Sequence, residues 1–460
     1  MRTFSEKLAG VLTAVMRFLE SRRGRIAFWV FFGITAIVIG QQTVSRAEIP
    51  EEVHVDELHY ETPMEIDTDE DHQAEWRSSE FGGFRKLSWG AVVEGIDQYT
   101  ELHTRAYPPF FAIAFFPFAL LWRCRGAGSA LFFLIGWGSS LLTAWCLSRW
   151  WQRREDKLHF GFFALLWLAM SPFVAAILLR CETDMIVILP ISAALLFLAR
   201  SRHRYVAGAL LGFAASFKVL PALFGIYLVA QRRWRALTGM VLAGVVCTVI
   251  LPTLVWGPTG AWERHLSWYE NVIAPYGSTG ASEVIGRPYR STNQSLAAAV
   301  HRFTTDIRAG KSGDYRQVNV LDLSPQQAGR IVTVLHGLIG LCLLFLWYFA
   351  RQDSEPPAVF ATVYATVPLG ILLLSEVSLT GHHIALFVPV AVIGARALIK
   401  QAPRARWWIW SITLAMLICA IGVEPTVELF SPLLIATLLL LIPTVALAMQ
   451  DIRNPDSPAT

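Results

Sequence analysis

The chain has 460 residues, of which 54% are hydrophobic and only 16% are charged, and its mean hydropathy is +0.46. Soluble domains carry about 25% charged residues, so this composition excludes a soluble protein and predicts a polytopic membrane protein. The spans are predicted to be helices, because a helix satisfies its own backbone hydrogen bonds and the alternating pattern of a membrane barrel is absent. The formal net charge of +4 says little by itself, since the distribution of the charges matters more.

The six cysteines are scattered along the chain and lie mostly among apolar residues. No CxxC pair and no Cys/His spacing typical of a metal site or a disulfide framework is present. We therefore expect packing roles for most of them, and no metal. The cysteines are Cys124, Cys146, Cys181, Cys247, Cys342 and Cys419.

The N-terminal 25 residues are basic and precede the first apolar segment, residues 26–42. Basic residues favour the cytoplasmic side of a membrane, so residues 1–25 are predicted to be cytoplasmic. Ser45-Arg46-Ala47 loosely resembles a signal-peptidase site. We predict an uncleaved first transmembrane helix instead, because many later apolar segments already commit the chain to the membrane.

Residues 43–125 are predicted to form an outer loop with interfacial helices. Residues 43–106 hold sixteen Asp and Glu against five Lys and Arg, which suits an outer location. Within them, residues 48–75 lack apolar periodicity and are expected to be a solvated, mobile loop, whereas residues 80–99 are typical of a short amphipathic helix on a membrane surface. Residues 107–122 contain three prolines and fall short of the about 20 residues that span a bilayer, so we expect an interfacial or re-entrant helix.

The remaining apolar segments alternate across the membrane when basic clusters are taken as cytoplasmic markers. Residues 126–256 are predicted to hold transmembrane helices 2–7, and residues 257–328 to form a second outer loop. Residues 329–449 are predicted to hold helices 8–12, and residues 450–460 to form a cytoplasmic tail. The expected fold class is therefore all-α, a polytopic membrane protein with about twelve transmembrane helices plus outer interfacial helices.

Residues 205–230 lie between two basic clusters, so this segment must enter the membrane and return to the same side. Lys218 and Pro221 stand near its middle, where the turn should be. The pattern predicts two short helices with Lys218 at the outer turn.

Ionisable residues that interrupt the apolar runs gather on the predicted outer face. Such residues are costly inside a bilayer and by default mark a functional site. The densest stretch is 180–184, which lies between two charge-free runs, residues 160–179 and 185–199. This convergence predicts an extracytoplasmic site. The residues are Glu80, Asp97, Glu182, Asp184, Lys218, His382, His383 and Glu424.

The acidic members of this set also have a structural interpretation. Glu80 and Asp97 could act as a general base toward a hydroxyl, or could be carboxylates favoured by a helix N-terminus. The same N-terminal interpretation applies to Glu182 and Asp184, and Arg180 could simply pair with one of them.

The basic members have two interpretations as well. Lys218 could snorkel to the membrane interface, or could hold a phosphate as a point charge. His382 and His383 could cap a helix, or could form with Lys218 a cationic site for an anionic leaving group. Asn293-Gln294-Ser295 matches an N-glycosylation acceptor.

Several motifs resemble glycosyltransferase family 87, a GT-C group of polyprenyl-phosphate-mannose-dependent α-mannosyltransferases. The resemblance runs from about residue 78 to residue 400. The segment around Lys218 is the most specific match, and the resemblance at Asn293 makes glycosylation the less favoured interpretation there. The motifs are Tyr107-Pro108-Pro109-Phe110-Phe111; Ala207-Gly208 through Phe217-Lys218-Val219-Leu220-Pro221 to Arg232-Arg233-Trp234-Arg235-Ala236; Asn293-Gln294-Ser295-Leu296; and Gly381-His382-His383.

The chain departs from the family pattern in three places. Glu80-Phe81 stands where the family usually has an Asp-Phe pair in the first outer segment. Cys181-Glu182-Thr183-Asp184 corresponds to a GQxN motif, so two acids replace two amides. Thr380 replaces the tryptophan expected before the histidine motif.

The resemblance implies an inverting, metal-independent transfer of a hexose, mannose being the family default, from a polyprenyl-phosphate donor without a further cofactor. It implies that Glu80 takes the proton of the acceptor hydroxyl, with Asp97 as the second choice. The residues implied for the donor phosphate are Lys218, His382, His383 and Arg180. Those implied for substrate binding are Glu182, Asp184, Tyr107, Asn293 and Gln294.

The expected acceptor is an extracytoplasmic glycolipid or glycan, and the expected location is the inner cell membrane, with membrane lipids as further partners and no nucleic acid. Two other classes stay open. A transporter or flippase of an anionic lipid or solute would use Lys218 and the histidines for binding without chemistry. Many transporters are built from internal repeats, and the absence of one in this sequence weakens the transporter hypothesis. A non-catalytic scaffold in envelope assembly is the second alternative.

Overall fold

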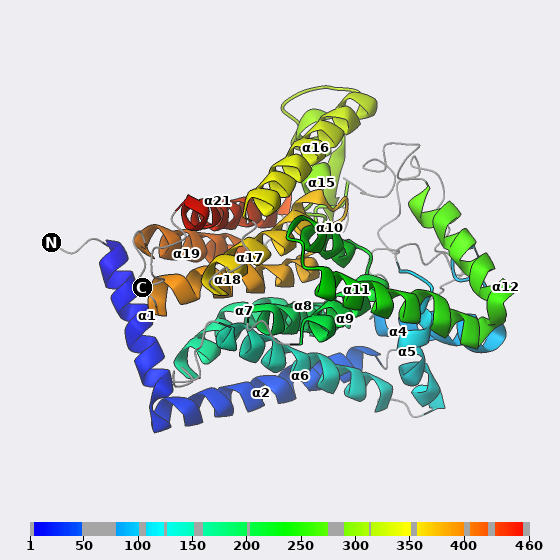
Figure 1. Cartoon of the computed structure of the whole chain (residues 1–460), viewed down its shortest axis with the longest axis horizontal. Helices are drawn as coiled ribbons and strands as arrows, with labels where there is room; N and C mark the ends of the chain where they lie inside the picture. Colours follow the sequence, from blue (N-terminus) through cyan, green and yellow to red (C-terminus); the bar gives the residue numbers. More distant parts are fainter. Residues whose placement is uncertain are drawn as a thin grey trace.

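The structure, a computed structural model, is a helical bundle (Figure 1). α1 lies across the end of the bundle nearest the N-terminus, whereas α4 and α5 lie at the opposite end. The residues described are 4–47, 80–100, 107–123, 127–150, 160–199, 203–274, 289–311, 314–350, 357–399, 405–421 and 428–453.

The first part of the chain builds one side of the bundle, where α2 contacts both α6 and α7, and α6 packs on α8. Its helices are α1 (Phe4–Glu20), α2 (Arg22–Ala47), α4 (Glu80–Trp89), η2 (Gly90–Glu94), α5 (Phe110–Ala119), η3 (Leu120–Arg123), α6 (Ala127–Arg149), α7 (Phe160–Arg180), α8 (Asp184–Ala199), α9 (Arg204–Phe217), η4 (Leu220–Ala222), α10 (Leu223–Ala230), α11 (Trp234–Val245), η5 (Val246–Ile250), α12 (Leu251–Trp268) and η6 (Tyr269–Ile273).

The second part builds the other side, where α17 packs against α21 and α16, and α19 packs against α21. Its elements are α15 (Leu296–Thr304), β1 (Arg308–Lys311), β2 (Asp314–Gln317), α16 (Pro325–Phe349), α17 (Pro357–Leu374), η7 (Thr380–Leu386), α18 (Phe387–Gly394), η8 (Ala395–Ile399), α19 (Ala405–Ile421) and α21 (Pro432–Arg453).

Six helical stretches in the described part of the chain are long and apolar enough to cross a membrane. Their outward-facing side chains include exposed apolar residues such as Ile37, Leu254 and Ile442, which suits contact with lipid. The fold class of a helical, polytopic membrane protein is therefore confirmed. The number of twelve spanning helices stays a prediction, because several other apolar helices are shorter. The six stretches are Arg22–Val44, Ala127–Arg149, Phe160–Arg180, Trp234–Ile273, Pro325–Phe349 and Pro432–Gln450.

Two features were not predicted from the sequence. Residues 4–20 form a helix of their own, α1, which packs on α7, and the Gly161 N–H donates to Glu20 Oε1 at 3.0 Å. The segment predicted as the second outer loop contains a short antiparallel hairpin, β1–β2, in which Arg308 pairs with Gln317. Both lie in stretches without a long apolar run, so hydropathy gave no signal for them.

The predicted pair of short helices in residues 205–230 is present. α9 ends at Phe217, Lys218 is extended (φ −135°), and a single 3-10 turn at Pro221 leads into α10. Proline cannot continue a helix without losing a hydrogen bond, so Pro221 explains why the backbone breaks here. The break leaves Lys218 outside both helices.

Small residues bring α9 and α11 into close contact. A Cβ atom at Gly208 would overlap the backbone carbonyl of Ala236, and one at Gly239 would overlap that of Tyr205. Glycines at a helix interface let two backbones approach, which is a common way to hold membrane helices together. This contact fixes α9, and with it the position of Lys218.

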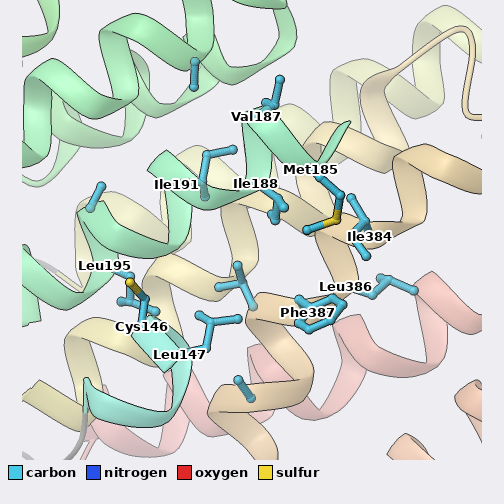
Figure 2. Close-up of a cluster of buried hydrophobic side chains, with 14 of the residues drawn as sticks. Cys146, Leu147, Met185, Val187, Ile188, Ile191, Leu195, Ile384, Leu386 and Phe387 are labelled. Atoms are coloured by element: carbon cyan, nitrogen blue, oxygen red, sulfur yellow. The ribbon is translucent and has the colours of Figure 1, made fainter. Parts of the chain in front are cut away.

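The core lies around α8, between α6 and the η7–α18 segment. Figure 2 shows Met185 of α8 beside Ile384, with Ile188 and Ile191 further along α8 and Leu195 beside Cys146 of α6. All of these side chains are buried. Apolar packing therefore begins directly after Asp184 on one segment and directly after His383 on the other.

Substitution of Gly208 tests the close contact of α9 and α11. We expect Gly208→Ala to lower the apparent unfolding temperature in detergent, because overpacking typically costs about 1–3 kcal/mol. Gly244→Ala is the matched control: it lies inside α11, gains the same helix propensity, and its Cβ would meet nothing within 4 Å. Equal unfolding temperatures for the two variants would contradict the contact.

Candidate active site

The turn between α7 and α8 carries three buried polar side chains. α7 ends at Arg180, Cys181 adopts a left-handed conformation (φ 56°), and Asp184 begins α8. The Glu182 N–H returns to the Ile177 carbonyl oxygen at 2.9 Å, which closes the end of α7. As a result Glu182, Thr183 and Asp184 all point into the protein and are buried.

Lys218 reaches this turn from the break between α9 and η4. Its Nζ lies 2.9 Å from Asp184 Oδ1, and the two side chains are only 17% and 9% exposed. Nζ also lies 5.7 Å from the centre of the Tyr107 ring, a cation–π distance. The structure thus joins three of the predicted site residues.

The charge on Lys218 is maintained by its neighbours. Burial alone would lower the pKa of Lys218, but the nearby Asp184, Tyr107 and Glu182 oxygens outweigh this effect and raise it. Lys218 is therefore a permanent cation at neutral pH. Asp184 Oδ2, by contrast, is buried and receives no hydrogen bond from a described residue.

Glu182 connects the turn to the histidine segment. Arg180 Nη1 lies 3.5 Å from Glu182 Oε1, which confirms that the arginine pairs with one of the two acids. The other carboxylate oxygen of Glu182 faces Gly381 so closely that a Cβ atom there would overlap it. The glycine before the histidine pair is therefore needed for the Glu182 carboxylate to fit.

His382 and His383 are held by their own loop. His382 Nδ1 lies between the Val377 carbonyl oxygen (3.3 Å) and the Leu379 N–H (3.4 Å), and His383 Nδ1 lies 3.0 Å from the Leu379 carbonyl oxygen.

The histidines are neutral at neutral pH. Burial lowers the pKa of His383 to about 4. Burial and the neighbouring Lys218 charge also lower the pKa of His382, although Asp184 opposes them. Lys218 is thus charged, whereas the histidines contribute neutral hydrogen-bonding groups.

The two carboxylates predicted as the base are placed differently. Glu80 is the first residue of α4, and its side chain lies outside the described residues. Asp97 accepts hydrogen bonds from the Tyr99 N–H (2.9 Å) and from Ser267 Oγ (2.6 Å). Tyr99 in turn donates to the Tyr107 carbonyl oxygen at 2.9 Å, so Asp97 is linked to the Lys218 cluster through two tyrosines.

Asn293 and Gln294 lie in a different network. Their side-chain amides bond the backbone of residues 376–378 and of residues 428–433. Asn293 is 2% exposed, so neither sugar attachment nor direct substrate contact is favoured by its position. The sequence motif identified these residues but did not reveal that their partners are backbone groups more than 80 residues away.

Glu376 and His336 form a pair that was not predicted. His336 Nδ1 on α16 lies 3.8 Å from Glu376 Oε1, and both side chains are 17% exposed. Burial raises the pKa of Glu376 to about 7. Glu376 follows the end of α17 and stands six residues before His382, and this proximity to the histidine motif was the available signal.

Some predicted residues cannot be placed. Glu424, Cys124 and residues 48–75 lie outside the described residues. Within the described residues no group of three or more His, Cys, Asp or Glu side chains is arranged to hold a metal ion.

A model of glycosyltransferase family 87 matches residues 106–375 of this chain, which is more than half of its length. The chain belongs to glycosyltransferase family 87. It is therefore a membrane glycosyltransferase with a sugar donor and an acceptor as substrates. No curated protein and no solved structure matches the chain.

The family 87 match covers part of the site. It includes Tyr107, the α7–α8 turn, Lys218 and Asn293, and it ends just before Glu376. Glu80 and the histidine pair lie beyond it, so their assignment rests on the motif resemblance and, for the histidines, on their electrostatic interaction with Asp184.

The Lys218–Asp184 contact predicts a measurable coupling in stability. We expect Asp184→Asn and Lys218→Met each to lower the apparent unfolding temperature, because breaking a buried ion pair costs about 3–5 kcal/mol. The double variant should lose less stability than the sum of the losses in the two single variants. Arg25→Gln is a control for an exposed pair with Glu20, expected to cost at most about 1 kcal/mol. Strict additivity would contradict a direct interaction.

Glu376→Gln is expected to change the pH dependence of stability. Since burial raises the pKa of Glu376 from 4.5 to about 7, the folded protein binds more protons than the unfolded chain between these pH values. Stability should therefore fall as the pH rises through this range, by at most about 3 kcal/mol, and the variant should lose this dependence. Unfolding temperatures measured from pH 5 to pH 8 test this, and parallel curves for both proteins would contradict it.

Proposed function

We propose that this family 87 glycosyltransferase is of the GT-C type and transfers a hexose, mannose in the first instance, from a polyprenyl-phosphate donor to an extracytoplasmic glycolipid or glycan. The observation that carries the proposal is the buried Lys218 ammonium, paired with Asp184 beside His382. A cation in a low-dielectric site interacts with a phosphate far more strongly than one in water. A lipid-linked phosphate suits a site that is surrounded by apolar helices.

The donor would bind with its phosphate at Lys218. Lysine holds phosphate as a point charge, and neutral His382 can donate a hydrogen bond to the same group. Asp184 and Glu182 would then accept hydrogen bonds from hydroxyls of the sugar. Asp184 Oδ2 is suited to this role, because it is buried without a hydrogen bond from a described residue.

The reaction would be a single displacement. An acceptor hydroxyl attacks the anomeric carbon, the new glycosidic C–O bond forms, and the bond between that carbon and the phosphate oxygen breaks. Glu80 takes the hydroxyl proton, with Asp97 as the second choice, and the polyprenyl phosphate leaves with the electron pair. Lys218 and His382 stabilise the negative charge that develops on the phosphate, which makes a metal-independent mechanism chemically sufficient.

Activity assays on two variants test this mechanism. We expect Lys218→Ala and Glu80→Gln each to lower transfer from a polyprenyl-phosphate sugar in vesicles by about 10²–10³-fold or more, because each removes a group that acts in the transition state. Lys86→Ala is a matched control, since Lys86 is an exposed lysine on α4. Asp97→Asn should retain activity if Glu80 is the base. Wild-type rates in both site variants would overturn the proposal.

The products in cells provide an independent check. Mass spectrometry of cell-envelope glycolipids, with and without the gene, should show one hexose missing when the gene is absent. Movement of a lipid across the membrane without a new glycosidic bond would instead identify a transporter.

A further inference from the structure

Residues 293–295 form hydrogen bonds with residues 376–378, which belong to the loop that precedes the histidine pair. Asn293 Oδ1 accepts from the Ser378 N–H (2.9 Å), and Asn293 Nδ2 donates to the Glu376 carbonyl oxygen (3.0 Å). Ser295 Oγ donates to the same Glu376 oxygen (2.8 Å). The Gln294 N–H donates to the Ser378 carbonyl oxygen (2.8 Å). These four hydrogen bonds define the backbone of residues 376–378.

The same short loop holds both histidines from its other backbone groups, and the Leu379 N–H donates to His382 Nδ1 at 3.4 Å. The Val377 oxygen lies 3.3 Å from His382 Nδ1, and the Leu379 oxygen lies 3.0 Å from His383 Nδ1. The carbonyls of Glu376 and Ser378 thus face residues 293–295, while those of Val377 and Leu379 face the histidines. A displacement of the loop on one side must therefore move the imidazoles on the other.

Residues 291 and 294 are in turn hydrogen-bonded to a third part of the chain, residues 428–433. Gln294 Nε2 donates to the Glu428 carbonyl oxygen (2.8 Å), and Gln294 Oε1 accepts from the Leu433 N–H (3.4 Å). Ser291 Oγ donates to Glu428 Oε2 (3.1 Å). The side-chain amides of Asn293 and Gln294 are buried with both their donor and their acceptor bonded, which makes residues 293–295 a rigid reference for the loop.

We propose that Asn293, assisted by Ser295, is a positioning residue for His382 and does not itself contact the sugar. Its amide supplies one donor and one acceptor to two backbone groups, a pairing that neither Asp nor Ala reproduces. The Leu379 N–H donates to His382 Nδ1, so the proton of the neutral ring lies on Nε2, which is left to donate to the leaving phosphate. The proposal rests on the role of His382 in the proposed function.

The test is a double-mutant comparison of transfer rates with polyprenyl-phosphate mannose in vesicles. Asn293→Ala should lower kcat by about 10–100-fold with little change in the donor KM, because a misplacement of about 1 Å can cost 10²-fold. In a His382→Ala background, the same substitution should cost less than about threefold further, since its effect passes through the imidazole. Asn319→Ala, which removes another amide-to-carbonyl hydrogen bond, is the control and should be active.

Other outcomes would overturn the proposal. The losses of kcat from the two substitutions could instead multiply, or the donor KM could rise while kcat is unchanged. Either result would mean that Asn293 acts on the substrate directly or only on global stability. Ser295→Ala, with Ser295→Thr as the conservative rescue, provides the same comparison should Asn293→Ala fail to fold. A wild-type protein that transfers no sugar from this donor would instead refute the proposed function.

Discussion

The ion pair between Lys218 and Asp184 is the contact on which the site depends. Two opposite charges in a poorly hydrated interior are stable only together, because either one alone would carry the full cost of desolvation. The pair therefore fixes the start of α8 against the end of α9. Tyr107 covers the ammonium, and this places the entry to α5 on the same cluster.

The helices must be interrupted for this pair to form. α7 and α8 reverse direction through the left-handed Cys181, and α9 and α10 are separated by the extended Lys218 and the turn at Pro221. The third segment, η7, approaches closely because Gly381 leaves room for the Glu182 carboxylate. Irregular backbone at these three points brings the polar side chains together among apolar helices, an arrangement that membrane proteins allow where the backbone is buried in protein.

The sequence predicted those elements whose signal is local. Apolar runs between charges located α6, α7 and α8, and the charge-free segment around Lys218 with Pro221 predicted the break correctly. The stretch 180–184 stood out because its charges are unusual between two apolar runs. These features depend on composition within about 20 residues, which is the range over which hydropathy is informative.

The contacts that complete the site could not be predicted in this way. The hydrogen bonds of Asn293 to residues 376–378 join positions more than 80 residues apart, and the pairing of His336 with Glu376 joins α16 to the segment that follows α17. Asn293 was expected to bind substrate because its motif resembles one of family 87. Its use for backbone hydrogen bonds emerges only when the partners are known. Likewise, the protonation state of the histidines follows from their burial and not from their spacing.

The acids at positions 182 and 184 alter the charge of the site in a way that bears on its substrates. Arg180 and Lys218 supply two positive charges, Glu182 and Asp184 supply two negative ones, and the histidines are neutral, so the cluster carries no net charge. With the two amides of the pattern that the chain resembles, the cations would be uncompensated. Under the proposed function, a donor phosphate would therefore meet a weaker attraction here, while sugar hydroxyls would meet stronger acceptors. The balance of recognition would then shift from the phosphate toward the sugar, and these two positions would be the place where specificity within the family diverges.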